Sequence, residues 1–280
     1  METRQLILSY FSLGAGPLQG ATGPGVTFEQ RVSAASAAGF SGVGLWGEDY
    51  KRSIASGALP GTLRAIADDH GVAVSELEVL DGWAVREPVG DQAAKERLFH
   101  EMADVFGSRH LHVMGPFDGS IDDAAEAFAG VCDRAAEHGL LVALEAMPFT
   151  NITDFGIGLD IVERAGRANG GLCLDAWHHF RGANDFDLLR AVPVDRIVSV
   201  QLDDGTAEPE VDDYVADTIS NRRPPGEGAF DLRGFIDELD RLGFVTPLSV
   251  EVLSTELSAL DPMVAALRLG DATRALLATA

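Results

Sequence analysis

Short apolar runs alternate along the chain with longer segments in which apolar residues recur every three or four positions. The short runs predict strands buried on both faces, and the longer segments predict amphipathic helices. The predicted strands are residues 6–11, 42–46, 72–80, 110–115, 141–148, 171–179, 196–204 and 247–254. The predicted helices are residues 27–40, 59–71, 91–107, 120–139, 158–170, 185–192, 230–243 and 261–278. Thr27 and Ser120 are expected N-caps, and Gly71 and Gly139 are expected to end helices.

This alternation gives eight strand–helix units in 280 residues, about 35 residues each. Eight such units are typical of a (β/α)8 TIM barrel, so we expect an α/β fold with a single domain over residues 1–280. The alternative is an open doubly wound sheet. The glycine-rich stretch after the first strand, SLGAGPLQGATGPG, leads into a loop and not directly into a helix, which favours the barrel.

Polar side chains follow four consecutive predicted strands. Glu145, Asp175, Gln201 and Glu251 each come directly after an apolar run. Active sites of such barrels lie at the carboxyl ends of the strands, so these groups are expected to converge there. Three carboxylates and an amide oxygen suit one divalent ion, with Mn²⁺ favoured and Mg²⁺ or Co²⁺ as alternatives. Alternatively, they are ordinary strand-end groups bonded to loop amides.

His178 lies three residues after Asp175, where the strand is expected to open into a loop. It could contact a substrate hydroxyl or act as an acid–base group beside the metal, or it could be a structural loop histidine. Aromatic residues also fall near strand ends and could wall a sugar-binding pocket or simply pack. They are Trp46, Trp83, Phe149 and Trp177.

Two arginines, Arg222 and Arg223, precede a turn of sequence PPGEG in the loop after the seventh strand. One of them could bind a substrate oxygen or carboxylate. Alternatively, they pair with nearby acids such as Asp203 or Asp204.

Composition narrows the classes of function. The chain has 21 basic and 44 acidic residues, a formal charge of −23, which disfavours nucleic-acid and membrane-surface binding. Only Lys51 and Lys95 are lysines, so Schiff-base chemistry is disfavoured. The two cysteines, Cys132 and Cys173, form no CxxC motif, and no export or membrane-spanning segment is recognised. We therefore expect a cytoplasmic protein.

Several segments together resemble the sugar phosphate isomerase/epimerase superfamily of xylose-isomerase-like barrels. The segments are LEAMPFTNITD, GLCLDAWHHFRG, VSVQLDD, RRPPGEGAFDL and PLSVEVLS. The superfamily includes ketose 3-epimerases, inosose dehydratase and isomerase, 3-dehydroshikimate dehydratases and endonuclease IV. The resemblance implies that Glu145, Asp175 and Glu251 are metal ligands, that His178 contacts substrate, and that Arg222 or Arg223 is the arginine before the PGxG turn.

One position departs from that pattern. Many members carry histidine where this chain has Gln201. An amide oxygen can replace the imidazole as a metal ligand, and this chain resembles some dehydroshikimate dehydratases in having glutamine there. The change favours a harder ion than zinc. It also weakens the similarity to a typical ketose epimerase and favours a dehydratase.

The expected activity is metal-dependent isomerisation or epimerisation of a polyhydroxy ketone through an enediolate. The resemblance implies that Glu145 and Glu251 act as the paired acids and bases. The alternative is a metal-dependent dehydratase of a hydroxy-ketone such as 3-dehydroshikimate or an inosose, with His178 as the base. An endonuclease and a non-catalytic sugar-binding barrel are disfavoured by the charge and by the carboxylate set respectively. The acidity favours an unphosphorylated small-molecule substrate, with no nucleic-acid or membrane partner, and a homo-oligomer is possible.

Overall fold

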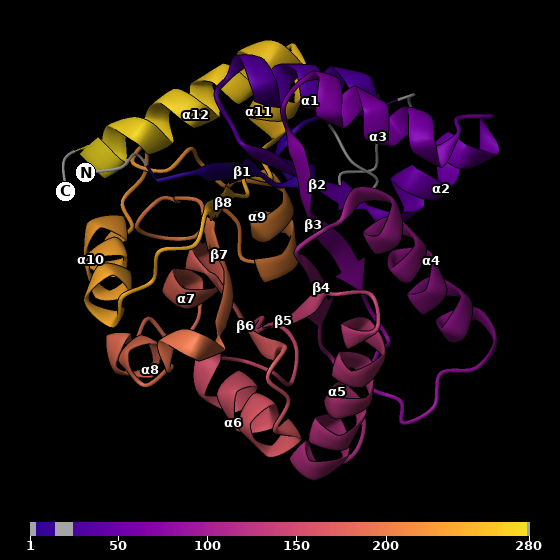
Figure 1. The fold of residues 1–280 in the computed structure, drawn as a ribbon. Coiled ribbons are helices and arrows are strands. Elements are labelled where there is room, and N and C mark those ends of the chain that lie inside the picture. The colour runs from indigo at the N-terminus through magenta and orange to yellow at the C-terminus, as the bar shows by residue number, and fades with distance from the viewer. Residues whose placement is uncertain (1–3, 15–24, 279–280) are drawn as a thin grey trace. The chain divides into compact units, whose positions relative to one another are not determined.

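The computed structural model describes residues 4–14 and 25–278. Across these residues eight parallel strands close into a barrel in sequence order, with helices between them (Figure 1). The predicted TIM barrel is confirmed. The strands are β1 Leu6–Leu8, β2 Gly42–Trp46, β3 Ala73–Leu80, β4 His110–Met114, β5 Leu141–Glu145, β6 Gly170–Asp175, β7 Ile197–Leu202 and β8 Leu248–Val250.

Eight of the helices correspond to predicted segments. They are α1 Phe28–Ala37, α3 Pro60–Asp69, α4 Gly90–Phe106, α5 Ile121–Ala136, α6 Phe155–Ala165, α8 Phe186–Arg190, α10 Leu232–Leu242 and α12 Pro262–Ala278. Further short elements follow strand ends or precede strands and were not predicted. They are η1 Tyr10–Ser12, α2 Gly47–Ala55, α7 Ala176–Arg181, η3 Val194–Arg196, α9 Tyr214–Ser220 and α11 Thr255–Ser258.

Capping residues explain several helix boundaries. The Thr27 side chain accepts from Gln30 N, and Ser120 accepts from Asp123 N, so both form the capping boxes that begin α1 and α5. The two predicted N-caps are therefore confirmed. Gly139, which follows the end of α5, has φ +71°, a conformation in which a side chain would be strained.

Several predicted strands are too long, and β5 and β8, for example, end at Glu145 and Val250. β1 ends at Leu8, and the chain turns into η1 instead of continuing to residue 11. β6 ends at Asp175, because the Asp175 side chain accepts from His178 N and begins α7. Residues 176–179, which were expected to belong to the strand, therefore form a helical turn. His178 consequently lies on a helix and not where a strand opens into a loop.

The chain divides into two compact units, and the division falls inside β2, α3, β3 and β7. The first unit contains the described residues of Met1–Gly44, Gly61–Ala73 and Gln201–Ala280. In it β1 pairs with both β2 and β8, and β7 pairs with β8, so that Ile7 lies opposite Ser249 and Gln201 also lies opposite Ser249. α12 packs along α1 in this unit (Figure 1).

The second unit contains Leu45–Pro60 and Val74–Val200. Its strands β3, β4, β5 and β6 are paired in parallel, with Met114 opposite Glu145 and Glu145 opposite Cys173. α5 and α6 lie side by side in this unit (Figure 1). The strands are buried over most of their length, as their apolar runs predicted.

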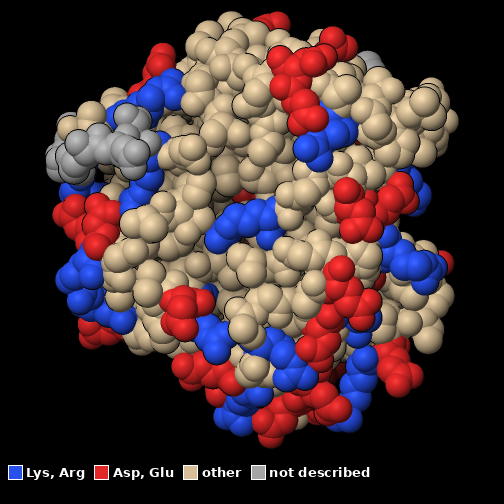
Figure 2. Space-filling model, viewed as in Figure 1, with Lys and Arg blue, Asp and Glu red and all other residues tan. Residues whose placement is uncertain are grey.

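Acidic and basic side chains are interspersed on the molecular face shown in Figure 2. Several acidic and basic side chains form ion pairs, since Arg164 pairs with Asp122 and Asp160, and Arg167 pairs with Asp133. Such exposed pairs contribute little stability each, but they spread the charge of a strongly acidic chain. No helix of the described residues is both long enough and apolar enough to cross a bilayer.

Candidate metal and substrate site

Glu145, Asp175 and His178 come together in the second unit. Each offers a ligand atom, and these atoms all lie within 4.8 Å of one another. His178 Nε2 is 3.4 Å from Glu145 Oε1 and 3.8 Å from Asp175 Oδ2. All three residues are buried. The cluster therefore places two carboxylates and an imidazole in a largely water-excluded space.

The local fold explains this convergence. Glu145 is the last residue of β5 and Asp175 is the last residue of β6, the neighbouring strand. Asp175 then caps α7, since its Oδ1 accepts from His178 N at 3.2 Å. This helical turn folds His178 back over the strand end, where an extended continuation would have carried it away. The i, i+3 spacing in the sequence is thus a helix-capping spacing.

The donor set fits a divalent cation. Two buried carboxylates held this close repel each other unless a proton or a cation lies between them. Carboxylate oxygens suit Mn²⁺ and Mg²⁺, imidazole nitrogens suit Zn²⁺, and these atoms are near enough to share one ion. The residues present are therefore chemically suited to hold such an ion.

The neighbouring aromatic and imidazole rings differ in their surroundings. Trp83 and Trp177 are fully buried, so both belong to the core. Phe149 is 47% exposed, and its ring centroid lies 6.2 Å from that of His178. His179 stacks on Phe155, and burial lowers its pKa to about 4. Phe149 therefore lies beside the cluster and remains partly open to solvent.

Trp46, predicted to contact substrate, is the last residue of β2 and is partly buried. The guanidinium carbon of Arg52 lies 5.4 Å from its ring centroid. Arg52 in turn bonds Asp49 at 2.7 Å. A substrate contact by Trp46 stays a prediction.

The two remaining predicted ligands lie in the first unit. Gln201 is on β7 and is 1% exposed, and Glu251 directly follows β8 and is 6% exposed. The Glu251 carboxylate accepts from Ser9 Oγ at 2.8 Å on Oε1 and from Arg222 Nη1 at 3.3 Å on Oε2. Glu251 is therefore a buried carboxylate with a donor on each oxygen.

Arg222 and Arg223 occupy different environments, which the sequence could not distinguish. Arg222 is 3% exposed, and its Nη1 donates to both Asp203 and Glu251. Arg223 is exposed, and its Nη2 lies 3.0 Å from Glu210 Oε1. The pairing with Asp203 considered from the sequence is thus present, and substrate binding by either arginine stays a prediction.

Asp204 fixes the turn that follows these arginines. Its buried carboxylate accepts four backbone N–H bonds, from Gly205, Gly226, Gly228 and Phe230, at 2.8 to 3.0 Å. A Cβ on Gly228 would lie 2.2 Å from Asp204 Oδ1, so the close approach requires glycine there. The backbone of the PPGEG turn is therefore held in place by hydrogen bonds to the Asp204 carboxylate.

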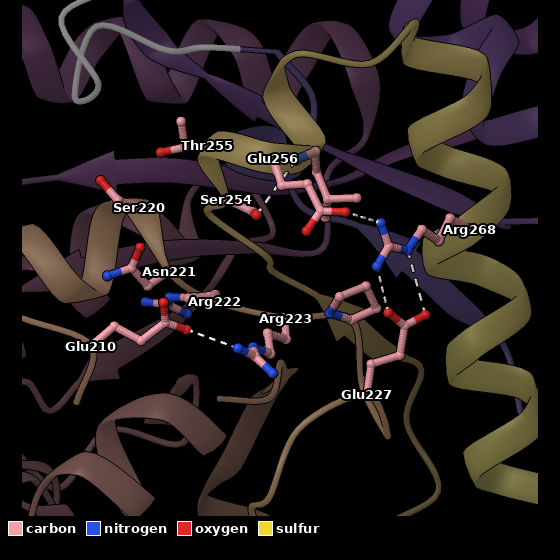
Figure 3. A pocket seen from close by; sticks show the side chains of 12 residues that line it. Glu210, Ser220, Asn221, Arg222, Arg223, Glu227, Ser254, Thr255, Glu256 and Arg268 are labelled. Carbon is pink, nitrogen blue, oxygen red and sulfur yellow. Dashed lines mark hydrogen bonds and ion pairs between the residues drawn. The ribbon is translucent and has the colours of Figure 1, made fainter. Parts of the chain in front are cut away.

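A polar pocket of about 360 Å³ opens beside this turn in the first unit (Figure 3). Arg223 lines it together with Glu210, and Arg268 spans Glu227 and Glu256 on another side. Each of these two arginines is already bonded to a carboxylate (Figure 3). The pocket is therefore polar but offers no excess of positive charge for an anionic ligand.

A second buried group lies on β3 and β4 of the second unit. His110 Nε2 is 2.9 Å from His112 Nε2 and 3.5 Å from Glu76 Oε2, and all three residues are almost fully buried. Burial lowers the pKa of His110 to about 3 and that of His112 well below its usual value. Both rings are therefore neutral, because charging them would be costly at this depth.

Arg109 constrains the tautomer of His110. Its Nη1 lies 3.3 Å from His110 Nδ1, and because a guanidinium only donates, Nδ1 must accept. The proton of His110 then sits on Nε2 and points at the acceptor Nε2 of His112. The Nε2 atoms of His110 and His112 thus share a hydrogen bond, and this disfavours a metal ion bound to either of them. The two-residue spacing of His110 and His112 places them on one face of β4, and the structure shows that they bond to each other.

Comparisons with known proteins identify a family and several relatives. A family model described as Xylose isomerase-like TIM barrel matches residues 32–272. A 3-dehydroshikimate dehydratase of Pseudomonas aeruginosa is 28% identical over 262 residues, covering 89% of this chain and 40% of that protein. An inosose isomerase of Halalkalibacterium halodurans is 34% identical over 127 residues, covering 44% of this chain and 43% of that protein. The chain thus spans less than half the length of these two relatives.

A solved structure of IOLI protein with a bound zinc atom is similar in fold. Its TM-score is 0.84 at 18% identity, covering 98% of each chain. At this identity the likeness supports the fold alone.

Proposed function

Since the chain belongs to the xylose isomerase-like TIM barrel family, we propose that it is a divalent-metal-dependent isomerase or epimerase of a polyhydroxy ketone. The relatives are enzymes, named as isomerases and dehydratases. The observation that carries the proposal is the buried cluster of Glu145, Asp175 and His178 at the ends of β5 and β6.

The proposed ligands are Glu145, Asp175, Gln201 and Glu251, which end or follow the consecutive strands β5 to β8. Their oxygen-rich chemistry favours Mn²⁺, with Mg²⁺ or Co²⁺ as alternatives. A relative's structure is described with zinc, and this supports a metal of some kind in the family. When bound, the ion polarises the ketone oxygen and stabilises the negative charge that develops there.

The chain's own residues then move protons. Glu145 and Glu251 are the proposed base and acid, one removing the proton from the carbon beside the ketone and the other returning a proton to the enediolate. His178, held 3.4 Å from Glu145, donates to or accepts from a substrate hydroxyl. Arg223 and Trp46 are proposed substrate contacts at the rim. The net charge of −23 favours an unphosphorylated ketose or inosose as substrate.

A second candidate, a hydro-lyase, is favoured by one specific observation. The dehydratase of Pseudomonas aeruginosa matches 89% of this chain, whereas the inosose isomerase match covers 44%. In that case His178 is the base that removes a proton, and a hydroxyl leaves from the next carbon. The proton and the hydroxyl depart together as water, leaving a conjugated carbon–carbon double bond.

One experiment separates these activities. Metal-stripped protein is reloaded with Mn²⁺ and incubated in D₂O with ketohexoses, inososes and 3-dehydroshikimate. Isomerisation introduces deuterium at carbon, which mass spectrometry detects, whereas dehydration gives a product absorbing in the ultraviolet. Failure of Mn²⁺ to bind, measured by calorimetry, would refute the metal-dependent function.

Substitutions test the assigned residues. Glu145→Gln and Glu251→Gln are expected to lower kcat by at least about 100-fold, because each removes a proposed acid–base group. Glu137→Gln, on the exposed end of α5, is the matched control and should leave kcat unchanged. Wild-type turnover in either site variant would contradict the roles assigned to Glu145 and Glu251.

A further inference from the structure

The Glu251 carboxylate is held by a donor on each of its oxygens. Ser9 Oγ donates to Oε1 at 2.8 Å, and Arg222 Nη1 donates to Oε2 at 3.3 Å. Ser9 follows β1 and is separated from Glu251 by 242 positions in the sequence. We propose that Ser9 and Arg222 are positioning residues that fix the Glu251 carboxylate for metal binding and proton transfer, an inference that rests on the proposed function.

Arg222 is itself held in one orientation. Its Nη1 donates to Asp203 Oδ2 and its Nε donates to the main-chain oxygen of Thr218 at 3.2 Å. The same Nη1 lies 3.4 Å from the main-chain oxygen of Glu251. A guanidinium with several fixed acceptors has few alternative rotamers. Arg222 therefore acts as a rigid support for Glu251 in a buried, low-dielectric setting.

The backbone on both sides of Glu251 is also fixed. Ser12 Oγ donates to Val250 O and accepts from Val252 N, both at 2.8 Å. Glu251 N donates to Leu202 O at 3.0 Å. Residues that follow β1 thus bond to both the main chain and the side chain at the end of β8. Neither the Cα nor the carboxylate of Glu251 can shift without breaking buried hydrogen bonds.

A carboxylate has about four lone-pair positions, so one hydrogen bond on each oxygen does not by itself prevent it from binding an ion. Partners that orient a metal ligand in this way commonly change metal affinity by 10- to 100-fold when removed.

The main test removes the Ser9 hydroxyl. Ser9→Ala is expected to weaken Mn²⁺ binding about 10-fold in calorimetric titration of the metal-stripped full chain. The matched control is Ser36→Ala, which loses a 2.8 Å bond to His70 O on the α1 side of the same unit. Ser36→Ala should keep wild-type affinity while losing similar thermal stability. Equal affinity in Ser9→Ala and the wild type would overturn the inference.

Arg222→Lys separates positioning from substrate binding. Lysine keeps the positive charge but cannot match the geometry of the guanidinium toward Asp203 and Glu251. We expect Mn²⁺ affinity and kcat to fall together. A rise in KM with unchanged Mn²⁺ affinity and kcat would show a substrate contact instead and would overturn the positioning role.

Crystal structures of the metal-free wild type and Ser9→Ala decide the matter independently of the metal. We expect one Glu251 rotamer in the wild type and a rotated or divided carboxylate in Ser9→Ala. The same single rotamer in both would refute the inference even if Mn²⁺ binds. If the wild type binds no Mn²⁺ but the rotamers differ, the proposed function fails while Ser9 is still shown to position Glu251.

Discussion

Asp204→Asn is predicted to be severely destabilising, although it exchanges atoms of nearly equal size. In the wild type Oδ1 accepts from Gly205 N and Phe230 N, and Oδ2 accepts from Gly226 N and Gly228 N. The carboxylate is 1% exposed, so water cannot replace these bonds. In asparagine one oxygen still accepts, but the NH₂ group faces two N–H donors whichever way the amide is turned.

The magnitude follows from the bonds lost. Hydrogen bonds to a charged group contribute about 1.5–3 kcal/mol each, so losing two costs about 3–6 kcal/mol. Opposed donors add to this cost, whereas relaxation of the turn reduces it. We therefore expect the free energy of unfolding to fall by about 4 kcal/mol, a large part of the stability of a typical domain.

Urea denaturation followed by circular dichroism measures this change. Asp231→Asn is the matched control, since Asp231 is exposed and caps α10 through one bond to Gly234 N at 2.9 Å. Its expected cost is at most about 1 kcal/mol. If Asp204→Asn costs no more than Asp231→Asn, the carboxylate does not organise the turn and the reasoning is refuted.

Three further predictions concern the strands and buried groups. Gly171→Ala should lower the unfolding temperature, because a Cβ there would lie 2.5 Å from Arg196 O. Gly61→Ala, at an open position in a helix, should raise the unfolding temperature. The reverse order of the two unfolding temperatures in calorimetry would contradict this. Cys132, buried with its pKa raised to about 12, should resist thiol reagents at pH 8 until urea is added, and rapid native labelling would show otherwise. His110, with its pKa lowered to about 3, binds fewer protons folded than unfolded, so the free energy of unfolding should fall below about pH 6.5 by up to about 1.4 kcal/mol per pH unit. In urea titrations from pH 7 to pH 5, His110→Gln should show a shallower fall, and an equal slope would be inconsistent with this origin.

Strand and helix periodicity predicted much of the fold, because both depend on neighbouring residues. Alternating apolar runs and helical spacing located all eight strands, and local side-chain oxygens at Thr27 and Ser120 located helix starts. Element ends were less certain. The strand predicted to reach residue 179 ends at Asp175, because a side-chain cap outweighed the apolar character of Ala176 and Trp177.

The candidate site was likewise predicted only in part from the sequence. Strand-end position alone singled out Glu145 and Asp175, and the structure brings them together with His178. The sequence treated Arg222 and Arg223 alike, yet one is buried between two carboxylates and the other bonds Glu210 near the surface. Their difference depends on which residues of distant elements reach each guanidinium.

The sequence by itself determined the barrel and the strand ends that carry the proposed oxygen ligands, since these follow from periodicity and from polar residues placed after buried strands. Only the tertiary structure decided which partners the buried polar side chains bond to. Ser9 bonds Glu251 across 242 positions, and Asp204 gathers amides from a turn more than twenty residues later. Such contacts form when the chain closes on itself, because burial then forces each polar group to find a partner that no local pattern specifies.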